Sequence, residues 1–475
     1  MSLPFHPPPF APRMLRAAVA SWLIAALAGC GGGGGGGTGS TAGDPSPPPP
    51  PVVVPIVLAV SGLAVTKMQE AGSGATLMEE RLGSLTDPGP FRQLVLLDDQ
   101  ARERGRFAPP AGWSLIDFAR HASGETSLAL ATARDVRVMR IDAAGAVLID
   151  MLLVDEQAAT DPFYDQGGVH DDSALVPVLT RDAVRLAALG ESAIVALRTG
   201  RNAAIAYRFD RAGTTYVRAW RALVEPGLSV FAIGITSGTF DTFDQLKNHW
   251  QVFVDADAAG IAVAVPSREQ FAPVFERHAA YFGEPVQAVN GALLTRLTPA
   301  GQRLGTTVID TGTTGELHGL RVHGASAVLV GRVFSAQRAD GGGWDAWFAR
   351  IGRDDGARLA YRPIDVDRGE ILFDTGALPA DRFIAVGAAG YTQNPTGASV
   401  SEDTAPMLLI LEADGSVSQR LPFPSGPRHN ELRSLALRGS TWTVAGLVNG
   451  PGTHSGDGNP ALIAADGIVQ PLTLP

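Results

Sequence analysis

The chain has 475 residues, a formal net charge of −10 and a single cysteine. The acidic balance argues against nucleic-acid binding, which needs clustered Lys and Arg to neutralise phosphates. It also argues against adsorption to an anionic membrane through a basic patch, and one cysteine excludes a disulfide within the chain. Hydrophobic residues make up 45% of the sequence, enough for a large folded core.

Residues 1–29 have the organisation of an export signal. Arg13 and Arg16 supply a positive start, and the apolar run Ala17–Leu27 follows. That run is shorter than the roughly 20 residues that a membrane-spanning helix needs, so we expect a cleaved signal and not a transmembrane helix.

The end of this signal indicates a lipid anchor. Leu27-Ala28-Gly29-Cys30 resembles the lipobox of bacterial lipoproteins, which implies that Cys30 becomes the lipidated first residue of the mature protein. Gly31, and not an aspartate, follows Cys30, and within that resemblance this favours the outer membrane. The partner implied by the leader is therefore the membrane, reached through the N-terminal lipid.

Residues 30–55 form a predicted tether between this anchor and a folded body. Gly31–Ser40 is a glycine-rich flexible coil, and Pro45–Pro51 is a stiff polyproline stretch. Such a segment holds a folded domain away from the membrane surface while leaving it free to reorient.

From residue 56 to residue 475 the sequence repeats itself. The stretch "GELHGLRVHGASAVLVGRV" (Gly315–Val333) matches "NELRSLALRGSTWTVAGLV" (Asn430–Val448), and a related copy spans Gly369–Ala388. Each copy is followed by two alternating strands around a glycine turn, which is a hairpin pattern. The predicted turn glycines are Gly145, Gly213, Gly301, Gly356, Gly415 and Gly467.

Repeats of this length with about four strands each are typical of propeller blades. The body resembles bacterial β-propeller repeat proteins, which implies an all-β fold. We expect a seven-bladed β-propeller, with eight blades as the alternative if residues 56–105 form an extra unit. The spacing of apolar residues over Arg268–Phe282 predicts a short inserted helix.

Two acidic stretches raise the question of metal binding. "DADAAG" (Asp255–Gly260) has only part of a calcium loop, and we interpret it as a hairpin turn. "HDD" (His170–Asp172) lacks the ligand spacing of a zinc site, and we interpret it as a solvated loop. We therefore assign no metal site, no cofactor and no catalytic residue.

Four residues remain as weak binding candidates. Glu316, Glu370 and Glu431 recur near the start of repeated strands, where a ring of acids would bind a cation or a basic partner. The competing interpretation, which we favour, is that a strand start simply carries a polar residue. Trp344 follows three glycines, and we expect it to be exposed and able to stack on a sugar or anchor a protein.

The sequence thus favours a lipid-anchored envelope protein whose propeller binds a protein or glycan partner. Nucleophile and cofactor motifs are not found in the sequence. An alternative stays open: a hydrolase or lyase acting on envelope polysaccharide through carboxylates in the propeller pocket, because such carboxylates leave no spacing signature.

Overall fold

The computed structural model consists of β-strands joined by turns over the residues that it describes. It describes residues 56–57, 63–80, 92–132, 135–153, 183–198, 203–225, 251–267, 278–279, 281–284, 286, 289–335, 343–390, 404–426, 429–450, 466–472 and 474. All of them belong to one compact unit over Val53–Pro475. Among these residues, no helix is long and apolar enough to cross a membrane.

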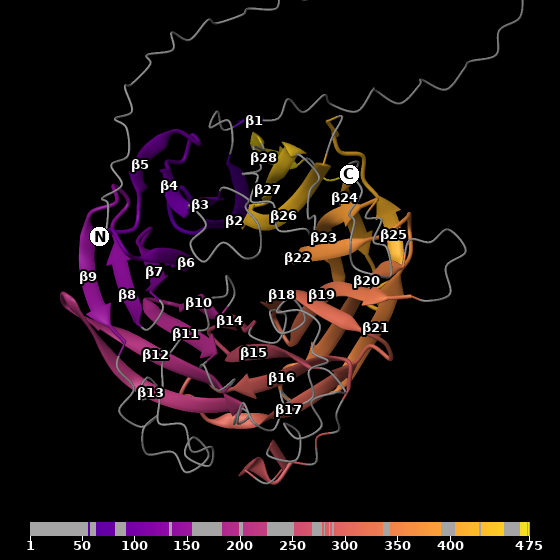
Figure 1. The fold of residues 1–475 in the computed structure, drawn as a ribbon, viewed down its shortest axis with the longest axis horizontal. Coiled ribbons are helices and arrows are strands. Elements are labelled where there is room, and N and C mark those ends of the chain that lie inside the picture. Colours follow the sequence, from indigo (N-terminus) through magenta and orange to yellow (C-terminus); the bar gives the residue numbers. More distant parts are fainter. Residues whose placement is uncertain are drawn as a thin grey trace, which may run out of the picture. The chain divides into compact units, whose positions relative to one another are not determined.

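Seven four-stranded antiparallel sheets stand around a central axis as the blades of a propeller (Figure 1). The innermost strands are β2 (Ala64–Glu70), β6 (Ser114–Arg120), β10 (Val184–Leu189), β14 (Phe253–Asp257), β18 (Gly315–His323), β22 (Ile371–Leu378) and β26 (His429–Arg438). The second strands are β3 (Ala75–Glu80), β7 (Thr126–Ala131), β11 (Ser192–Arg198), β15 (Gly260–Ser267), β19 (Ser326–Phe334), β23 (Arg382–Ala389) and β27 (Thr441–Gly450). The third strands are β4 (Arg92–Leu97), β8 (Val136–Ile141), β12 (Ala204–Ala212), β16 (Gly291–Leu297), β20 (Trp344–Gly352), β24 (Ala405–Leu411) and β28 (Asp466–Leu472). The outermost strands are β5 (Glu103–Phe107), β9 (Val147–Leu152), β13 (Thr215–Glu225), β17 (Arg303–Asp310), β21 (Arg358–Ile364), β25 (Val417–Arg420) and β1 (Ile56–Val57).

Blades 1 to 6 each use four consecutive strands, whereas blade 7 combines β26, β27 and β28 with β1 from the start of the unit. Ile56 pairs with Val469 and Val57 with Ile468, so the two ends of the propeller close the ring together. The seven-bladed prediction is confirmed. The eight-bladed alternative is wrong, because blade 1 is the unit at residues 64–107 and the short strand before it completes blade 7.

The burial of the strands explains the sequence pattern. The second and third strands are covered on both faces by neighbouring blades, so β7 and β15 are buried at every position and consist mainly of apolar and small residues. Outermost strands such as β9 contain exposed, half-buried and buried positions. This difference in covering is why the second and third strands are more continuously apolar in the sequence than the outermost strands.

Turn glycines behave as predicted in five of the six hairpins. The backbone φ is +89° at Gly145, +65° at Gly213, +82° at Gly301, +72° at Gly356 and +83° at Gly415, and this left-handed region favours glycine. The prediction fails at Gly467, which lies inside β28 and pairs with Leu447. It fails because the fourth strand of blade 7 comes from β1, so no hairpin turn is needed there.

The other repeated glycines, Gly331, Gly387 and Gly446, lie in the second strand of blades 5, 6 and 7. A Cβ atom at Gly331 would lie 1.9 Å from the Glu316 carbonyl oxygen on the innermost strand. The corresponding distance to a backbone oxygen is 1.8 Å at Gly387 and 2.0 Å at Gly446. The repeat therefore needs glycine because two strands approach closely at this point.

The substitution Gly331→Ala tests this close approach. We expect it to lower the free energy of unfolding by about 2 kcal/mol, because the added methyl group forces the backbone of β18 away from β19. Urea denaturation measures the change. Gly324→Asn is the control, since no atom lies within 4 Å of a Cβ there and asparagine tolerates its φ of +56°. Equal stability of Gly331→Ala and the wild type would contradict the steric explanation.

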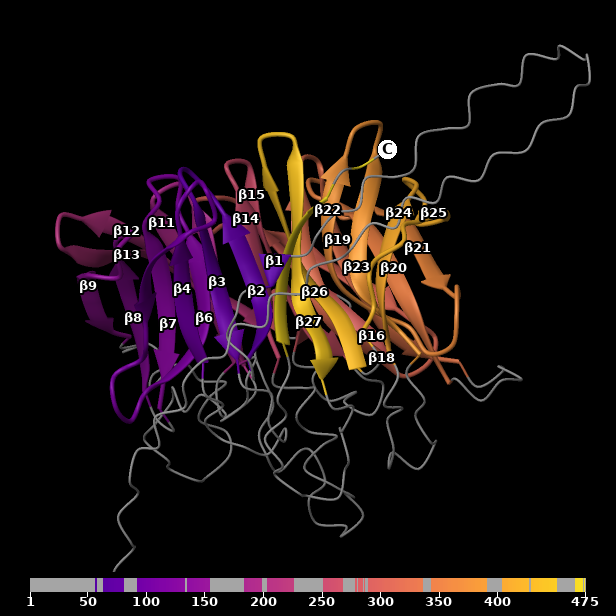
Figure 2. The ribbon, with the colours of Figure 1, turned by 90° about the horizontal axis from the view of Figure 1, so that it is seen from above.

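The two faces of the propeller differ in their connections. The turns between first and second strands are short, as at Asp257–Gly260 and Arg438–Thr441, and they lie along one face (Figure 2). The innermost strands begin at the opposite face. Connections between blades leave from that second face, and one of them runs from residue 226 to residue 252. We call this second face the entry face.

Two further predictions concern individual segments. The "DADAAG" stretch is a hairpin turn, as predicted, and the Asp257 carboxylate accepts the backbone N–H of Ala259 and Gly260. The predicted helix over Arg268–Phe282 lies mainly outside the described residues. Only 278–279 and 281–282 have helical backbone among the residues described there, and these short pieces do not make up a helix.

Candidate functional site

A cavity of about 200 Å³ occupies the centre of the propeller. All seven innermost strands contribute to its wall, so no single repeat contains the site. The lining residues are Thr66, Lys67, Gln69, Met78, Glu80, Arg92, Asp117, Arg185, Leu186, Gln251, Phe253, Val254, Asp255, His318, Gly319, Leu320, Arg321, Phe373, Asp374, Arg433 and Ser434.

Seven of these residues, one from each innermost strand, form what we call the channel ring. Its members in blade order are Lys67, Asp117, Arg185, Asp255, Arg321, Asp374 and Ser434. Cationic and acidic side chains alternate through the first six positions. Opposite charges on neighbouring blades favour a closed ring, since each blade attracts the next.

The acidic members of the channel ring also bind neighbouring backbones. Asp117 accepts the N–H of Leu186 at 2.8 Å, and Asp255 accepts the N–H of Val322 at 2.8 Å. Asp374 accepts the N–H of Leu435 at 2.9 Å. Each of these hydrogen bonds joins one blade to the next and gives the carboxylates partners that water would otherwise supply.

Ser434 makes the corresponding link between blades 7 and 1. Its hydroxyl accepts the backbone N–H of Met68 at 3.1 Å. The polar bonding around the axis therefore includes the junction at which the two ends of the propeller meet.

Ion pairs hold the cationic members of the channel ring in place. Lys67 Nζ lies 2.7 Å from Asp117 Oδ1, and it donates to the Phe118 carbonyl at 2.7 Å. Arg321 forms a bidentate pair with Asp374, with both N–H···O distances at 2.7 Å. Arg185 Nη1 lies 4.0 Å from Asp117 Oδ1.

Burial and these ion pairs shift the pKa values of Lys67, Arg321 and Asp255. Burial lowers the pKa of Lys67, although Asp117 acts in the opposite direction. Burial likewise acts to lower the pKa of Arg321, but Asp374 outweighs it and raises that pKa. Burial raises the pKa of Asp255 above its usual range.

A second set of cavity side chains comes from β-bulges. The strand pairing shifts register at Leu317/Gly319, Leu372/Asp374 and Leu432/Ser434. The extra residue in each case is His318, Phe373 or Arg433, and all three line the cavity. Bulges redirect side chains out of the regular alternation of a strand, and here they place an imidazole, a phenyl ring and a guanidinium on three neighbouring blades.

These three side chains form one continuous patch. The rings of His318 and Phe373 meet edge to face, with their centroids 5.6 Å apart. The Arg433 guanidinium lies 4.2 Å from the centroid of the Phe373 ring, which is a cation–π contact.

Glu316 and Glu431 lie directly behind this patch. Glu316 lies 2.7 Å from Arg332 Nε and 3.3 Å from His318 Nε2. Burial opposes its ionisation, but Arg332 and His318 hold the pKa of Glu316 well below its usual range. Glu431 pairs in the same way with His429 and Arg433. These two candidates therefore position the bulge residues and are themselves buried.

Glu370 occupies a different environment. Its Oε1 accepts the backbone N–H of Val366 at 3.1 Å and also that of Asp367. Its carboxylate lies within 4.8 Å of those of Asp345 and Asp365. Three carboxylates that each offer one ligand atom supply fewer oxygens than the six to eight that calcium takes, and Glu370, like Glu316 and Glu431, is not among the residues that line the cavity.

Trp344 is not exposed, which corrects the expectation from the sequence. It is 7% exposed. Its ring packs against Phe334, with centroids 5.6 Å apart, and under the Arg332 guanidinium at 4.3 Å. The preceding glycines do not expose it, because the ring folds back onto the second strand of its own blade.

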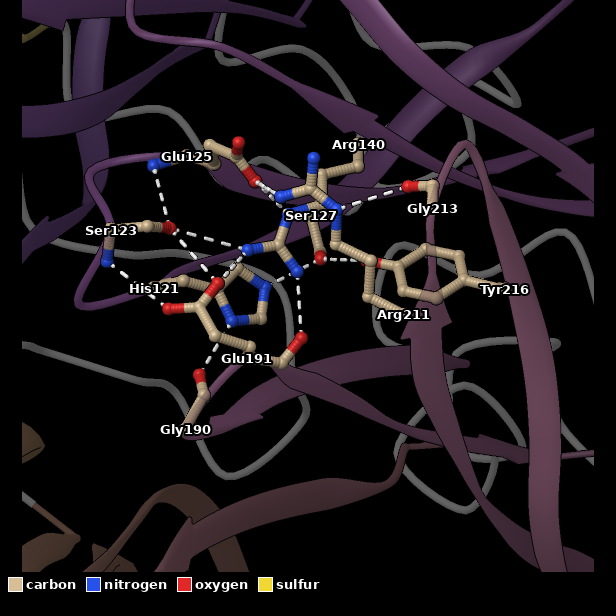
Figure 3. Close-up of polar contacts among 10 residues, drawn as sticks. All are labelled: His121, Ser123, Glu125, Ser127, Arg140, Gly190, Glu191, Arg211, Gly213 and Tyr216. Carbon is tan, nitrogen blue, oxygen red and sulfur yellow. Dashed lines mark hydrogen bonds and ion pairs between the residues drawn. The ribbon is translucent and has the colours of Figure 1, made fainter.

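A polar cluster links blades 2 and 3 at the face opposite the entry face, where the turns between first and second strands lie (Figure 3). His121 Nε2 lies 2.6 Å from Ser127 Oγ, which in turn lies 2.6 Å from the Tyr216 hydroxyl. His121 Nδ1 lies 2.8 Å from the Gly190 carbonyl oxygen. His121 and Ser127 are both fully buried, so this Ser–His pair stabilises the blade junction and does not present a nucleophile to a substrate.

The burial of His121 makes the free energy of unfolding depend on pH. Burial, with Arg140 nearby, lowers the pKa of His121 to about 4. Between pH 6.5 and 4 the unfolded chain therefore binds a proton that the folded chain does not, so stability falls as the pH falls through this range. The predicted loss from this one group is about 2 kcal/mol between pH 6.5 and 5.

Urea denaturation of the wild type and of His121→Gln at pH 7 and pH 5 measures this effect. We expect the variant to lose less free energy of unfolding between the two pH values than the wild type does. An equal loss in both proteins would assign the acid sensitivity to other groups, such as His323, whose pKa burial also lowers to about 4.

Residues 1–55, which hold the predicted signal, the lipobox with Cys30 and the tether, lie outside the described residues, and so does His170–Asp172.

The fold and its cavity define the chain as a seven-bladed β-propeller with a charged central site. No family model and no curated protein matches the sequence. Similar solved structures include a chain of the mitotic checkpoint complex, with 8% identity, 90% of this chain and 98% of that chain covered, and a TM-score of 0.46. A catalytically inactive variant of virginiamycin B lyase from Staphylococcus aureus, solved with quinupristin, has 9% identity, coverages of 89% and 98%, and a TM-score of 0.46. Sqt1 from Saccharomyces cerevisiae has 8% identity, coverages of 88% and 98%, and a TM-score of 0.44. At these values the likeness carries no functional argument, and the fold rests on the strand pairing itself.

Proposed function

We propose that this protein is an exported binding protein of the bacterial cell envelope, held to the membrane by a lipid on Cys30. Residues 30–55 are the tether, and the propeller recognises a protein or glycan partner at its entry face. The outer membrane is the proposed location, from the residue that follows the lipobox cysteine.

The hydrogen bonds and ion pairs of the cavity carboxylates are the observation that supports binding most directly. Asp117, Asp255 and Asp374 each accept a backbone N–H from the next blade, and two of them also pair with a cation. A general acid or nucleophile has to exchange these partners for a substrate during each turnover. Carboxylates committed to joining blades favour a fixed recognition surface over the alternative of a polysaccharide hydrolase or lyase.

The entry face supports this proposal for a second reason. The innermost strands begin there, and their bulge residues His318, Phe373 and Arg433 lie near those strand starts. Ligand sites commonly form where connections of variable length surround a rigid scaffold. The short turns of the opposite face offer no comparable variation in length.

Fatty-acid labelling in the cells that make the protein tests the anchor. Cells are fed an alkyne-labelled fatty acid, and the full-length wild type is compared with Cys30→Ala. We expect label and membrane association in the wild type only. An unlabelled wild type, or equal labelling of the variant, would contradict lipidation at Cys30.

Crosslinking followed by affinity purification tests recognition in the same two strains. The proposal expects one envelope component to be recovered with the wild type and to be reduced with Cys30→Ala, because the tether holds the propeller near its partner. Recovery of no envelope component from the wild type would contradict a stable partner.

A further inference from the structure

We infer that the central cavity binds a small carboxylate-bearing ligand of about the size of one sugar ring, a sugar acid in chemical terms. This inference rests on the proposed binding function and specifies the ligand class. Three observations carry it: which charges face the cavity, which hydrogen-bond donors remain there, and the aromatic patch on its wall.

Three ion pairs at the cavity wall bury the acid more deeply than the cation. The Lys67 side chain is 19% exposed and that of Asp117 is 0% exposed, and for Arg321 and Asp374 the values are 22% and 8%. Arg433 is 21% exposed and its partner Glu431 is 0% exposed. The exposed fractions belong mainly to cations, so the cavity presents a positive surface although the wall as a whole is nearly balanced in charge.

The Arg92–Glu80 pair and the carboxylate of Asp255 also line the cavity, and neither makes its surface negative. Arg92 and Glu80 form a pair that is buried on both sides, at 3% and 1% exposure, and they add little to the surface charge. Asp255 is half-buried, and its carboxylate already accepts the backbone N–H of Val322. An anion entering the cavity therefore meets more accessible positive than negative charge.

Arg321 keeps donors for a ligand after it has formed its ion pair. A guanidinium carries five N–H groups, and Arg321 uses Nε and Nη2 for Asp374. Among the described residues, its Nη1 group makes no hydrogen bond within the wall. Arginine binds planar carboxylates through two parallel hydrogen bonds, so a carboxylate matches this surface better than a spherical anion does.

The size and the aromatic wall limit the rest of the ligand. A cavity of about 200 Å³ is smaller than the roughly 300–1,000 Å³ of sites for drug-sized molecules. The half-buried Phe373 ring, between His318 and Arg433, offers an apolar surface beside the cations. A single sugar ring that carries one carboxylate combines an apolar face, hydroxyl groups and the required charge.

Isothermal titration calorimetry of the full-length protein in detergent tests this inference with three probes. Glucuronate carries both features, glucose lacks the carboxylate, and acetate lacks the ring. We expect glucuronate to bind at least tenfold more tightly than either of the other two. Equal affinity for glucose would overturn the role of charge, and equal affinity for acetate would overturn the role of the sugar ring.

Substitutions locate the binding. We expect Arg433→Gln and, independently, Arg185→Gln to weaken glucuronate binding at least tenfold, while Arg358→Gln on the exposed outer strand β21 leaves it unchanged. Two cavity variants are used because Arg433 also pairs with buried Glu431, and thermal denaturation verifies that each variant folds. Unchanged affinity in both folded cavity variants would place any binding outside the cavity.

This experiment separates failure of the inference from failure of the proposed function. If no heat is released with glucuronate but an envelope partner is still recovered by crosslinking, the ligand class is wrong and the binding function stands. If neither result is obtained, both proposals fail.

Discussion

The substitution Asp374→Ala is expected to lower the free energy of unfolding by about 4 kcal/mol, the largest loss that we predict for a single substitution. Asp374 is 6% exposed and joins two groups at the axis. It pairs with Arg321 through two hydrogen bonds and accepts the backbone N–H of Leu435 on the next blade. Alanine leaves a guanidinium and an amide without their acceptor in a largely buried position.

Equilibrium denaturation in urea measures this loss, with Asp414→Ala as the matched control. Asp414 also pairs with an arginine, Arg362, but the two side chains are 62% and 50% exposed. Exposed pairs contribute at most about 1 kcal/mol, so the control is expected to change little. Similar losses in the two variants would contradict a special role for the channel ring.

The substitution Arg140→Met is expected to cost about 3 kcal/mol at the junction of blades 2 and 3. The Arg140 side chain is fully buried. It pairs with Glu125 and Glu191, and it donates to the Glu191 carbonyl oxygen at 2.7 Å (Figure 3). Methionine fills a similar volume but leaves these acceptors without their donor. The loss is smaller than at Asp374 because the Glu125 and Glu191 side chains are 19% and 47% exposed and can be rehydrated.

Thermal unfolding of Arg140→Met and Arg137→Met measures this difference. Arg137 lies on the same strand, and its ion-pair partner Asp150 is 45% exposed. We expect a clearly lower midpoint for Arg140→Met than for Arg137→Met. If the two midpoints fall by the same amount, the buried cluster does not hold the blades together.

Much of the fold could be predicted from the sequence because its signals are local. A hairpin with a glycine such as Gly301 at positive φ is encoded within about ten residues, and the repeat spacing then gives the propeller. The closure by β1 could not be predicted in this way. It pairs residues 56–57 with residues 468–469, and two residues carry too little pattern to identify a strand.

The cavity was missed for a related physical reason. Its side chains lie on seven strands that are far apart in sequence, and each contributes at most three polar residues. A signal was nevertheless present, since Asp117 in "LIDFAR" and Asp374 in "ILFDTG" each interrupt an apolar strand two residues after a leucine. Both positions follow a bulge. A lone charge at a repeated position in a buried strand indicates a contact at the axis.

The acids chosen from the sequence were close to the site without forming it. Glu316 and Glu431 sit at equivalent positions, as their repeats predicted, but each is turned into the blade and pairs with an arginine. Their role is to support the bulge residues that reach the cavity. Repetition in the sequence therefore located the right strand ends, whereas the side-chain directions depend on the bulges.

Site-specific photocrosslinking in the cells that make the protein tests recognition at the entry face most directly. A photoreactive amino acid is placed at Thr313, exposed just before β18 on the entry face, or at Ser440, exposed in the short turn between β26 and β27 on the opposite face. We expect a crosslinked envelope component from position 313 and none from position 440. Crosslinking of the same component from position 440 alone would contradict this expectation.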